Sequence, residues 1–172
     1  MRKVIIGIGI PGSGKTKALK ELAEKFGYAY VCPDDIRAKL LGNTTDQSKG
    51  DEVWDEAYNR VATALAEGQA VVFDATFTNE PARLELINFA REHGADKIQG
   101  IRIDAPLEVA KERNQSRDRV VPEHVLERMD AKLHKNEPNL GEGFDSIFTL
   151  NEFQQLQRIE MEGQRGKIEH RV

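Results

Sequence analysis

The stretch Gly9-Ile10-Pro11-Gly12-Ser13-Gly14-Lys15-Thr16 fits the pattern G-x-x-x-x-G-K-[ST], and the apolar run Val4-Ile5-Ile6-Gly7-Ile8 precedes it. A β-branched run followed directly by this motif is typical of a strand that ends in a phosphate-binding loop. The alternative is a glycine-rich turn that binds nothing. Because the motif stands in the expected strand context, the sequence predicts a site for a nucleoside triphosphate.

Each residue type in the motif has a physical task. The backbone of Gly12, Ser13 and Gly14 can curl so that successive N–H groups point at the phosphates. Lys15 is expected to reach the β- and γ-phosphates, and the Thr16 hydroxyl to ligate Mg²⁺. The predicted ligands are therefore ATP, or another nucleoside triphosphate, and Mg²⁺.

Composition limits the class of protein. The 172 residues suit a single domain, and the formal net charge of −4 lacks the basic excess of proteins that coat nucleic acid. Any nucleic-acid contact must then be local. The single cysteine, Cys32, excludes an intramolecular disulfide, and no N-terminal apolar segment is long enough for a signal peptide or a membrane span. We therefore expect a cytoplasmic protein with no membrane partner.

Apolar, β-rich runs alternate with helical patterns along the chain. Strands are expected over 4–8, 28–32, 70–73, 98–103 and 146–150. Helices are expected over 16–26, 36–41, 53–67, 81–93 and 107–113, with a last one starting at Pro122. This rhythm predicts an α/β fold: a three-layer αβα sandwich with a five-stranded parallel sheet and ligands at the carboxyl ends of the strands.

The predicted core covers about residues 3–150, and residues 151–172 form a C-terminal extension of the same domain. Within that extension, residues 163–172 are polar and interrupted by glycines. We expect this end of the chain to be mobile or to dock on a partner.

The segment Pro33-Asp34-Asp35-Ile36-Arg37 follows the second predicted strand. A carboxylate there can accept the proton of an attacking hydroxyl, and an arginine can hold an acidic acceptor. We therefore interpret Asp34 as a general base and Arg37 as a substrate-binding, catalytic residue. The alternative is helix capping by Asp34 or Asp35 with Arg37 merely solvated.

The third strand delivers Asp74-Ala75-Thr76. Asp74 can hold a Mg²⁺-bound water or order the loop opposite Thr16. Since Ala75 stands where motor-type ATPases usually carry a glutamate that activates water, transfer to an acceptor is favoured over hydrolysis. Thr76 and Asn79 are candidates to hydrogen-bond that acceptor. A turn is the alternative role for three residues, Thr78, Asn79 and Pro81.

An arginine-rich stretch, Arg113-Asn114-Gln115-Ser116-Arg117-Asp118-Arg119, lies between a predicted helix and Pro122. Arginines closing over a triphosphate would neutralise developing charge and exclude water, so the stretch is interpreted as a lid. Arg113 and Arg117 are the predicted contacts to the nucleotide. The alternative is a solvated loop with ion pairs through Asp118 and Glu112.

Together these motifs resemble the P-loop kinases of the polynucleotide 5′-hydroxyl kinase type. The likeness covers about residues 3–150 and rests on G-x-P-G-S-G-K-T, D-x-x-R, D-A-T and R-N-x-x-R followed by V-P. It implies that Asp34 is the general base, that Arg37 holds a phosphate of the acceptor strand and that Thr76 touches the acceptor. Asp74 would support the metal or the loop, and the lid arginines would close on ATP. The phosphatase motif D-x-D-G-T of the phage enzyme has no counterpart in this sequence.

We therefore expect a kinase that transfers the γ-phosphoryl group of ATP to a hydroxyl, foremost the 5′-OH end of a polynucleotide or oligonucleotide. One alternative is a small-molecule kinase with a nucleoside, sugar or antibiotic-like acceptor. Another is a nucleotide-binding module or slow ATPase without an acceptor.

Other candidates have ordinary interpretations. His93, His124, His134 and His170 lack metal-ligand spacing, so no zinc site is expected. Trp54 and Tyr58 share a helical face that is interpreted as core rather than as a base-stacking platform. A basic patch can steer a phosphate-bearing acceptor or be an ordinary helix surface; its residues are Lys132, His134 and Lys135.

Overall fold

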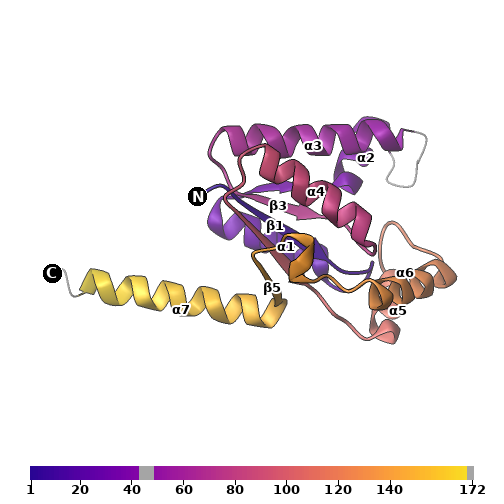
Figure 1. The fold of residues 1–172 in the computed structure, drawn as a ribbon. Coiled ribbons are helices and arrows are strands. Elements are labelled where there is room, and N and C mark those ends of the chain that lie inside the picture. Colours follow the sequence, from indigo (N-terminus) through magenta and orange to yellow (C-terminus); the bar gives the residue numbers. More distant parts are fainter. Residues whose placement is uncertain (43–48, 170–172) are drawn as a thin grey trace.

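The computed structural model describes residues 1–42 and 49–169. Strands and helices alternate along most of the chain, as Figure 1 shows. The strands are β1 (Lys3–Ile8), β2 (Ala29–Val31), β3 (Val71–Asp74), β4 (Lys97–Arg102) and β5 (Ser146–Thr149). The helices are α1 (Lys15–Phe26), α2 (Pro33–Leu41), α3 (Gly50–Ala66), α4 (Glu80–Glu92), α5 (Leu107–Gln115), α6 (Glu123–Lys135), the 3-10 helix η1 (Leu140–Glu142) and α7 (Leu150–Glu169).

The five strands form one parallel sheet in the order β2-β3-β1-β4-β5. The first strand is central, with Val4 opposite Val71 of β3 on one side and Ile98 of β4 on the other. Parallel strands need crossover connections, which the intervening helices supply on both faces. The predicted α/β fold with a five-stranded parallel sheet is confirmed, and the carboxyl ends of β1, β2 and β3 lie side by side.

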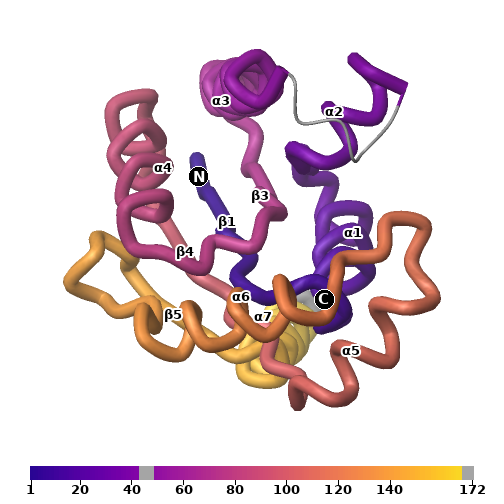
Figure 2. Tube along the Cα trace, turned by 90° about the vertical axis from the view of Figure 1, so that its right-hand side faces the viewer, coloured from indigo at the N-terminus to yellow at the C-terminus, as the bar shows by residue number. Residues whose placement is uncertain are grey.

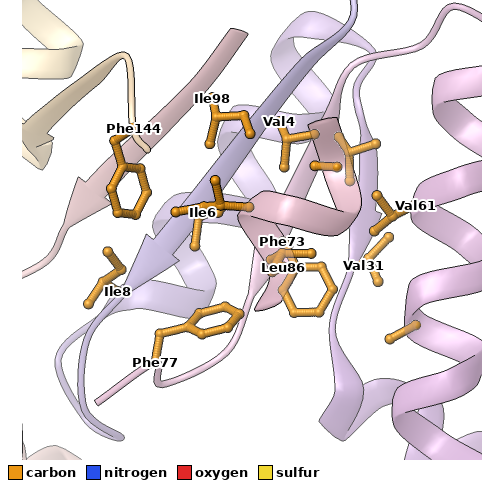
Figure 3. Close-up of a cluster of buried hydrophobic side chains, with 14 of the residues drawn as sticks. Val4, Ile6, Ile8, Val31, Val61, Phe73, Phe77, Leu86, Ile98 and Phe144 are labelled. Atoms are coloured by element: carbon orange, nitrogen blue, oxygen red, sulfur yellow. The ribbon is translucent and has the colours of Figure 1, made fainter. Parts of the chain in front are cut away.

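Alternate residues of the central strand serve two separate cores. Val4, Ile6 and Ile8 face the layer of α3 and α4, whereas Ile5 faces the layer of α1. The first core is drawn in Figure 3, where Phe73 and Phe77 lie beside Leu86 of α4. Because β1 is buried on both faces, its sequence is almost continuously apolar.

The C-terminal segment is helical up to Glu169, and its docking on a partner stays a prediction. Residues 163–169 are not a separate tail but the end of α7, which runs away from the body of the molecule in Figure 1. Buried Phe153 anchors the start of this helix against the second core. A helix nucleated there propagates through good helix formers, so Gly163 and Gly166 interrupt the sequence pattern without ending the helix. No helix among the described residues is both long and apolar enough to span a bilayer.

Candidate active site

The loop between β1 and α1 has glycines at positions where the backbone conformation or the space excludes a Cβ. Gly12 and Gly14 have φ angles of 83° and 88°, in the left-handed region. A Cβ on Gly12 would lie 2.2 Å from the carbonyl oxygen of Ala110, so the backbone of α5 rests directly on this loop. Gly14 is the N-cap of α1, and unpaired N–H groups at a helix start favour an anion.

The lysine of the motif is tied to the third strand. Lys15 Nζ donates to Asp74 Oδ1, and the hydroxyl of Tyr30 on β2 donates to Asp74 Oδ2. Asp74 and Lys15 are both buried. Burial, and then the negative charge of Asp74, raise the pKa of Tyr30, so this phenol remains a hydrogen-bond donor. Asp74 thus organises Lys15, while Tyr30, which no motif indicated, holds the other carboxylate oxygen.

The segment after β2 brings an acid and an arginine together. Asp34 and Arg37 are one helical turn apart on α2, and Arg37 NH1 donates to Asp34 Oδ1 at 2.7 Å. Arg37 is only 5% exposed, and its Nε has no hydrogen-bond partner among the described residues. The capping alternative is not supported: the N-cap of α2 is Cys32, no capping bond from Asp34 or Asp35 is present among the described residues, and Arg37 is not solvated. The Asp34 side chain remains 44% exposed and is accessible to a substrate.

The arginine-rich stretch crosses the carboxyl ends of the strands. Arg113 NH1 donates to the carbonyl oxygen of Ser13 at 3.3 Å, and Arg119 NH1 donates to Asp34 Oδ1 at 2.8 Å. Arg117 has a buried NH1 without a hydrogen-bond partner among the described residues. In the part of the chain that the structure describes, no ion pair joins these arginines to Asp118 or Glu112, so the ion pairs of the solvated-loop alternative are not observed.

The base of this loop is closed by buried Asn114, at the end of α5. Its amide donates to the carbonyl oxygen of Val121 at 2.7 Å, and its side-chain oxygen accepts from Val121 N at 3.1 Å. Residues 115–120 therefore form a closed loop that lies over the same end of the sheet as the phosphate-binding loop (Figure 2). We call residues 113–121 the lid.

One cavity of about 400 Å³ joins these elements. Of the predicted site residues, the lining includes Gly12, Gly14, Lys15, Thr16, Asp34, Arg37, Asp74, Thr76, Arg113 and Arg117. Ser13 is buried beside it and does not line it. Further residues line the cavity, among them Ile10, Cys32, Trp54, Arg119, Val121 and Met129.

The interpretation of Trp54 as a core residue is confirmed, and the residue also lines the cavity. Its ring stacks on Phe73 at a centroid distance of 5.9 Å, as a core residue would, and its exposed part lines the cavity. The basic patch on α6 is different. Lys132, His134 and Lys135 are exposed and do not line the cavity.

Two polar residues of the loop after β3, Thr76 and Asn79, have different roles. Thr76 lines the cavity, and its carbonyl oxygen accepts from Gly9 N at 3.3 Å. Asn79 instead is the N-cap of α4 and accepts from Ala82 N at 2.9 Å, and it does not line the cavity. Sequence reasoning missed Arg83, whose fully buried guanidinium bonds Glu142 and the carbonyl oxygen of Phe77.

The donor set fits a magnesium ion bound with a nucleotide. Thr16 supplies a hydroxyl and Asp74 a carboxylate to the same cavity. Mg²⁺ prefers such oxygen ligands, and usually takes one or two of them together with water and substrate phosphates. Both Asp74 oxygens already accept hydrogen bonds, which favours contact through water.

Comparisons with known proteins show the family of this chain and the proteins that share its fold. A family model described as AAA domain matches residues 4–135. A protein of Acanthamoeba polyphaga mimivirus, described as a bifunctional polynucleotide phosphatase/kinase, is 28% identical over 116 residues, which are 67% of this chain and 24% of the viral protein.

Two solved structures report on the fold. A chain in the structure of the Pnkp1/Rnl/Hen1 RNA repair complex has a TM-score of 0.72 and 21% identity, over 79% of this chain and 45% of that one. A gluconokinase from Sinorhizobium meliloti 1021 has a TM-score of 0.56 and 18% identity, over 87% of this chain and 85% of the gluconokinase. The chain thus spans about a quarter of the viral relative and less than half of the RNA repair chain. By the family match over residues 4–135, this chain belongs to the AAA domain family, with the fold of the P-loop kinases and a resemblance to polynucleotide kinases.

Proposed function

We propose that this protein is a kinase that transfers the γ-phosphoryl group of ATP to the 5′-hydroxyl end of a polynucleotide or oligonucleotide. One observation carries the proposal. The cavity that contains the phosphate-binding loop also contains an exposed carboxylate paired with a buried arginine, Asp34 and Arg37. A site that only binds or hydrolyses a nucleotide has no need of this pair, whereas a hydroxyl acceptor needs both a base and an anchor.

The phosphoryl donor, ATP, would bind at the phosphate-binding loop before α1. Backbone N–H groups around Gly14 and the Lys15 ammonium would hold the β- and γ-phosphates, with Thr16 and Asp74 on the side of the metal. Bound Mg²⁺ would neutralise phosphate charge and orient the γ-phosphoryl group. Lys15 would exchange its contact with Asp74 for phosphate oxygens, which are stronger acceptors of its charge.

The acceptor would bind beside α2. Arg37 lines the cavity, has a buried Nε without a hydrogen-bond partner among the described residues, and would hold a phosphate of the acceptor strand. The acceptor O–H bond breaks as its proton passes to Asp34, and the oxygen bonds the γ-phosphorus. The bond from that phosphorus to the β,γ-bridging oxygen breaks, so ADP leaves with the electron pair. Arg117, with its buried and unpaired NH1, is the lid arginine best suited to the charge that develops on the transferred group.

The viral relative supports a polynucleotide acceptor, since that protein is described as a bifunctional polynucleotide phosphatase/kinase. A small-molecule acceptor is the second candidate. Its support is the gluconokinase, which shares the fold over 85% of its own length, a larger share than either polynucleotide-related chain. With either acceptor, ATP would bind at the same phosphate-binding loop and Asp34 would be the base.

The test is transfer of labelled γ-phosphate from ATP, with Mg²⁺, to short 5′-OH oligonucleotides of DNA and of RNA. We expect label on the 5′ end, its loss in Lys15→Ala, and a fall of at least about 100-fold in Asp34→Asn, because an amide cannot accept the proton. Glu52→Gln, an exposed acid on α3, is the matched control and should leave transfer unchanged.

Each failure has its own meaning. If the protein binds ATP but labels no oligonucleotide, the polynucleotide acceptor is wrong, and nucleosides and sugars become the acceptors to assay. If Asp34→Asn transfers at the normal rate with saturating acceptor, the assignment of the base is wrong.

A further inference from the structure

Arg119 makes a contact that none of the proposed roles requires. It lies in the lid, 85 positions from Asp34 in the chain, and yet its NH1 donates to Asp34 Oδ1 at 2.8 Å. The Arg119 side chain is 27% exposed and that of Asp34 44%, so this contact is partly buried. A hydrogen bond between charged groups in such a position is stronger and more directional than one at an open surface.

The two arginines on Asp34 bind the same oxygen. Arg37 NH1 lies 2.7 Å from Oδ1 and Arg119 NH1 lies 2.8 Å from it. Within residues 1–42 and 49–169, no hydrogen bond reaches Oδ2. A carboxylate held at one oxygen from two directions cannot rotate freely about its Cβ–Cγ bond, and its second oxygen keeps its lone pairs for another donor.

We propose that Arg119 is a positioning residue for phosphoryl transfer: together with Arg37 it fixes Asp34 through Oδ1, so that Oδ2 accepts the proton of the acceptor hydroxyl. This inference rests on the proposed function, since it assigns an orientation to the proposed base. Arg119 itself touches neither the hydroxyl nor the γ-phosphorus in this arrangement.

The position of Arg119 separates it from the other lid arginines. Arg113 reaches the phosphate-binding loop through the carbonyl oxygen of Ser13. Arg117 lines the cavity, and its buried NH1 has no hydrogen-bond partner among the described residues. Arg119 alone of the three reaches the acceptor side. The Asn114 side chain closes the base of the lid. The contact of Arg113 with Ser13 and the contact of Arg119 with Asp34 are therefore mechanically connected. In this arrangement, closure of the lid over the nucleotide also orients Asp34. The proposed base is then best aligned when the lid covers the phosphate-binding loop.

The first test compares Arg119→Ala, Arg119→Lys and Arg128→Ala, the last being an exposed arginine on α6 that serves as the matched control. For Arg119→Ala we expect kcat to fall about 10- to 100-fold, the scale of a small misplacement of a reacting group. The Kd for ATP and the KM for the oligonucleotide should stay within about twofold, because no ligand contact is removed. Arg119→Lys should recover part of kcat, and Arg128→Ala should change none of these quantities. A normal kcat in Arg119→Ala, or a loss expressed mainly as weaker ATP binding, overturns the inference.

The second test asks whether Arg119 acts through Asp34. Single-turnover transfer is measured for Asp34→Ala and for the double variant with Arg119→Ala. If the arginine acts only by orienting the carboxylate, its removal from the Asp34→Ala protein should cost less than about twofold. A loss as large as in the wild-type background would show that Arg119 acts elsewhere. Normal transfer in Asp34→Ala would instead refute the proposed base. Thermal unfolding of each variant checks the fold, and Arg119→Gln replaces the alanine variant if that protein fails to fold.

Discussion

At the scale of single residues, Gly12 sits where two backbones meet. A Cβ there would lie 2.2 Å from the Ala110 carbonyl oxygen, and the φ angle of 83° is unfavourable for any other residue. We expect Gly12→Ala to push α5 away from the phosphate-binding loop and to weaken ATP binding at least about 10-fold. Equilibrium binding of a fluorescent ATP analogue measures this loss.

Gly68 supplies the control for this substitution. It also has a positive φ, 75°, but a Cβ there would meet nothing within 4 Å. Gly68→Ala should therefore show only the conformational penalty, about 1 kcal/mol in the free energy of unfolding, with normal ATP binding. Equal effects of the two substitutions on ATP binding would contradict the close approach of α5.

The thiol of Cys32 offers a pH-dependent observable at the cavity wall. Burial, and then the charge of Asp74, raise its pKa from the ordinary 9.0 to about 11. Since only the thiolate is alkylated, iodoacetamide should react slowly at pH 8 and faster as pH rises toward 11. Because the pKa of Cys32 is raised in the folded state, the contribution of the protonated thiol to the free energy of unfolding is complete below pH 9.0. It is lost as pH rises through about 11. Alkylation that follows an ordinary titration near pH 9 would show that this thiol is not buried.

At the scale of elements, the lid depends on Asn114. Its side chain is 1% exposed and makes two hydrogen bonds with the backbone of Val121. Asn114→Ala removes both bonds and loosens residues 115–120. Because a loose lid admits water, ATP hydrolysis without acceptor should rise relative to transfer, by about 5-fold or more. The ratio of released phosphate to labelled acceptor measures it, with exposed Asn88→Ala as the control; an unchanged ratio would mean that the lid does not exclude water.

The packing of α4 against η1 depends on a buried ion pair. The Arg83 and Glu142 side chains are 0% and 1% exposed, and Arg83 also bonds the carbonyl oxygens of Phe77 and Asn136. Arg83→Met leaves Glu142 buried without its partner, so we expect a loss of about 3–5 kcal/mol in the free energy of unfolding. Adding Glu142→Met should restore part of that loss.

An exposed ion pair serves as the reference for Arg83. Arg60 and Glu56 on α3 are 39% and 41% exposed, and replacing either by alanine should cost about 0.5 kcal/mol or less. Denaturant unfolding measures all four proteins. A small cost for Arg83→Met, or a double variant less stable than the single one, would contradict this account of the buried pair.

At the scale of the whole molecule, the charge distribution limits how an oligonucleotide is held. The formal net charge is −4, and the arginines at the cavity are the local exception. With one or two phosphates contacted, log KM for the oligonucleotide should rise with log salt concentration with a slope of about 0.7–1.4. Arg37→Ala should lower that slope by about 0.7. A wild-type slope above about 3 would reveal an extended nucleic-acid surface outside the cavity.

Much of the architecture could be predicted because its causes are local. The apolar run of β1 followed by a glycine-rich loop, the acids after β2 and the acid at the end of β3 are each readable from a few consecutive residues. Parallel strands bring their carboxyl ends to one edge, so these motifs had to meet. The extent of α7 was not predicted, because Gly163 and Gly166 resemble breakers until the anchoring of Phe153 is known.

The sequence by itself determined the α/β class, the phosphate-binding loop and the acid–arginine pair one helical turn apart on α2. Only the tertiary structure decided which long-range partners complete the site. Tyr30 meets Asp74 across 44 positions and Arg119 meets Asp34 across 85. The physical reason is that periodicity and turn chemistry act over a few residues, whereas a contact between distant side chains depends on crossover connections and on loop closure.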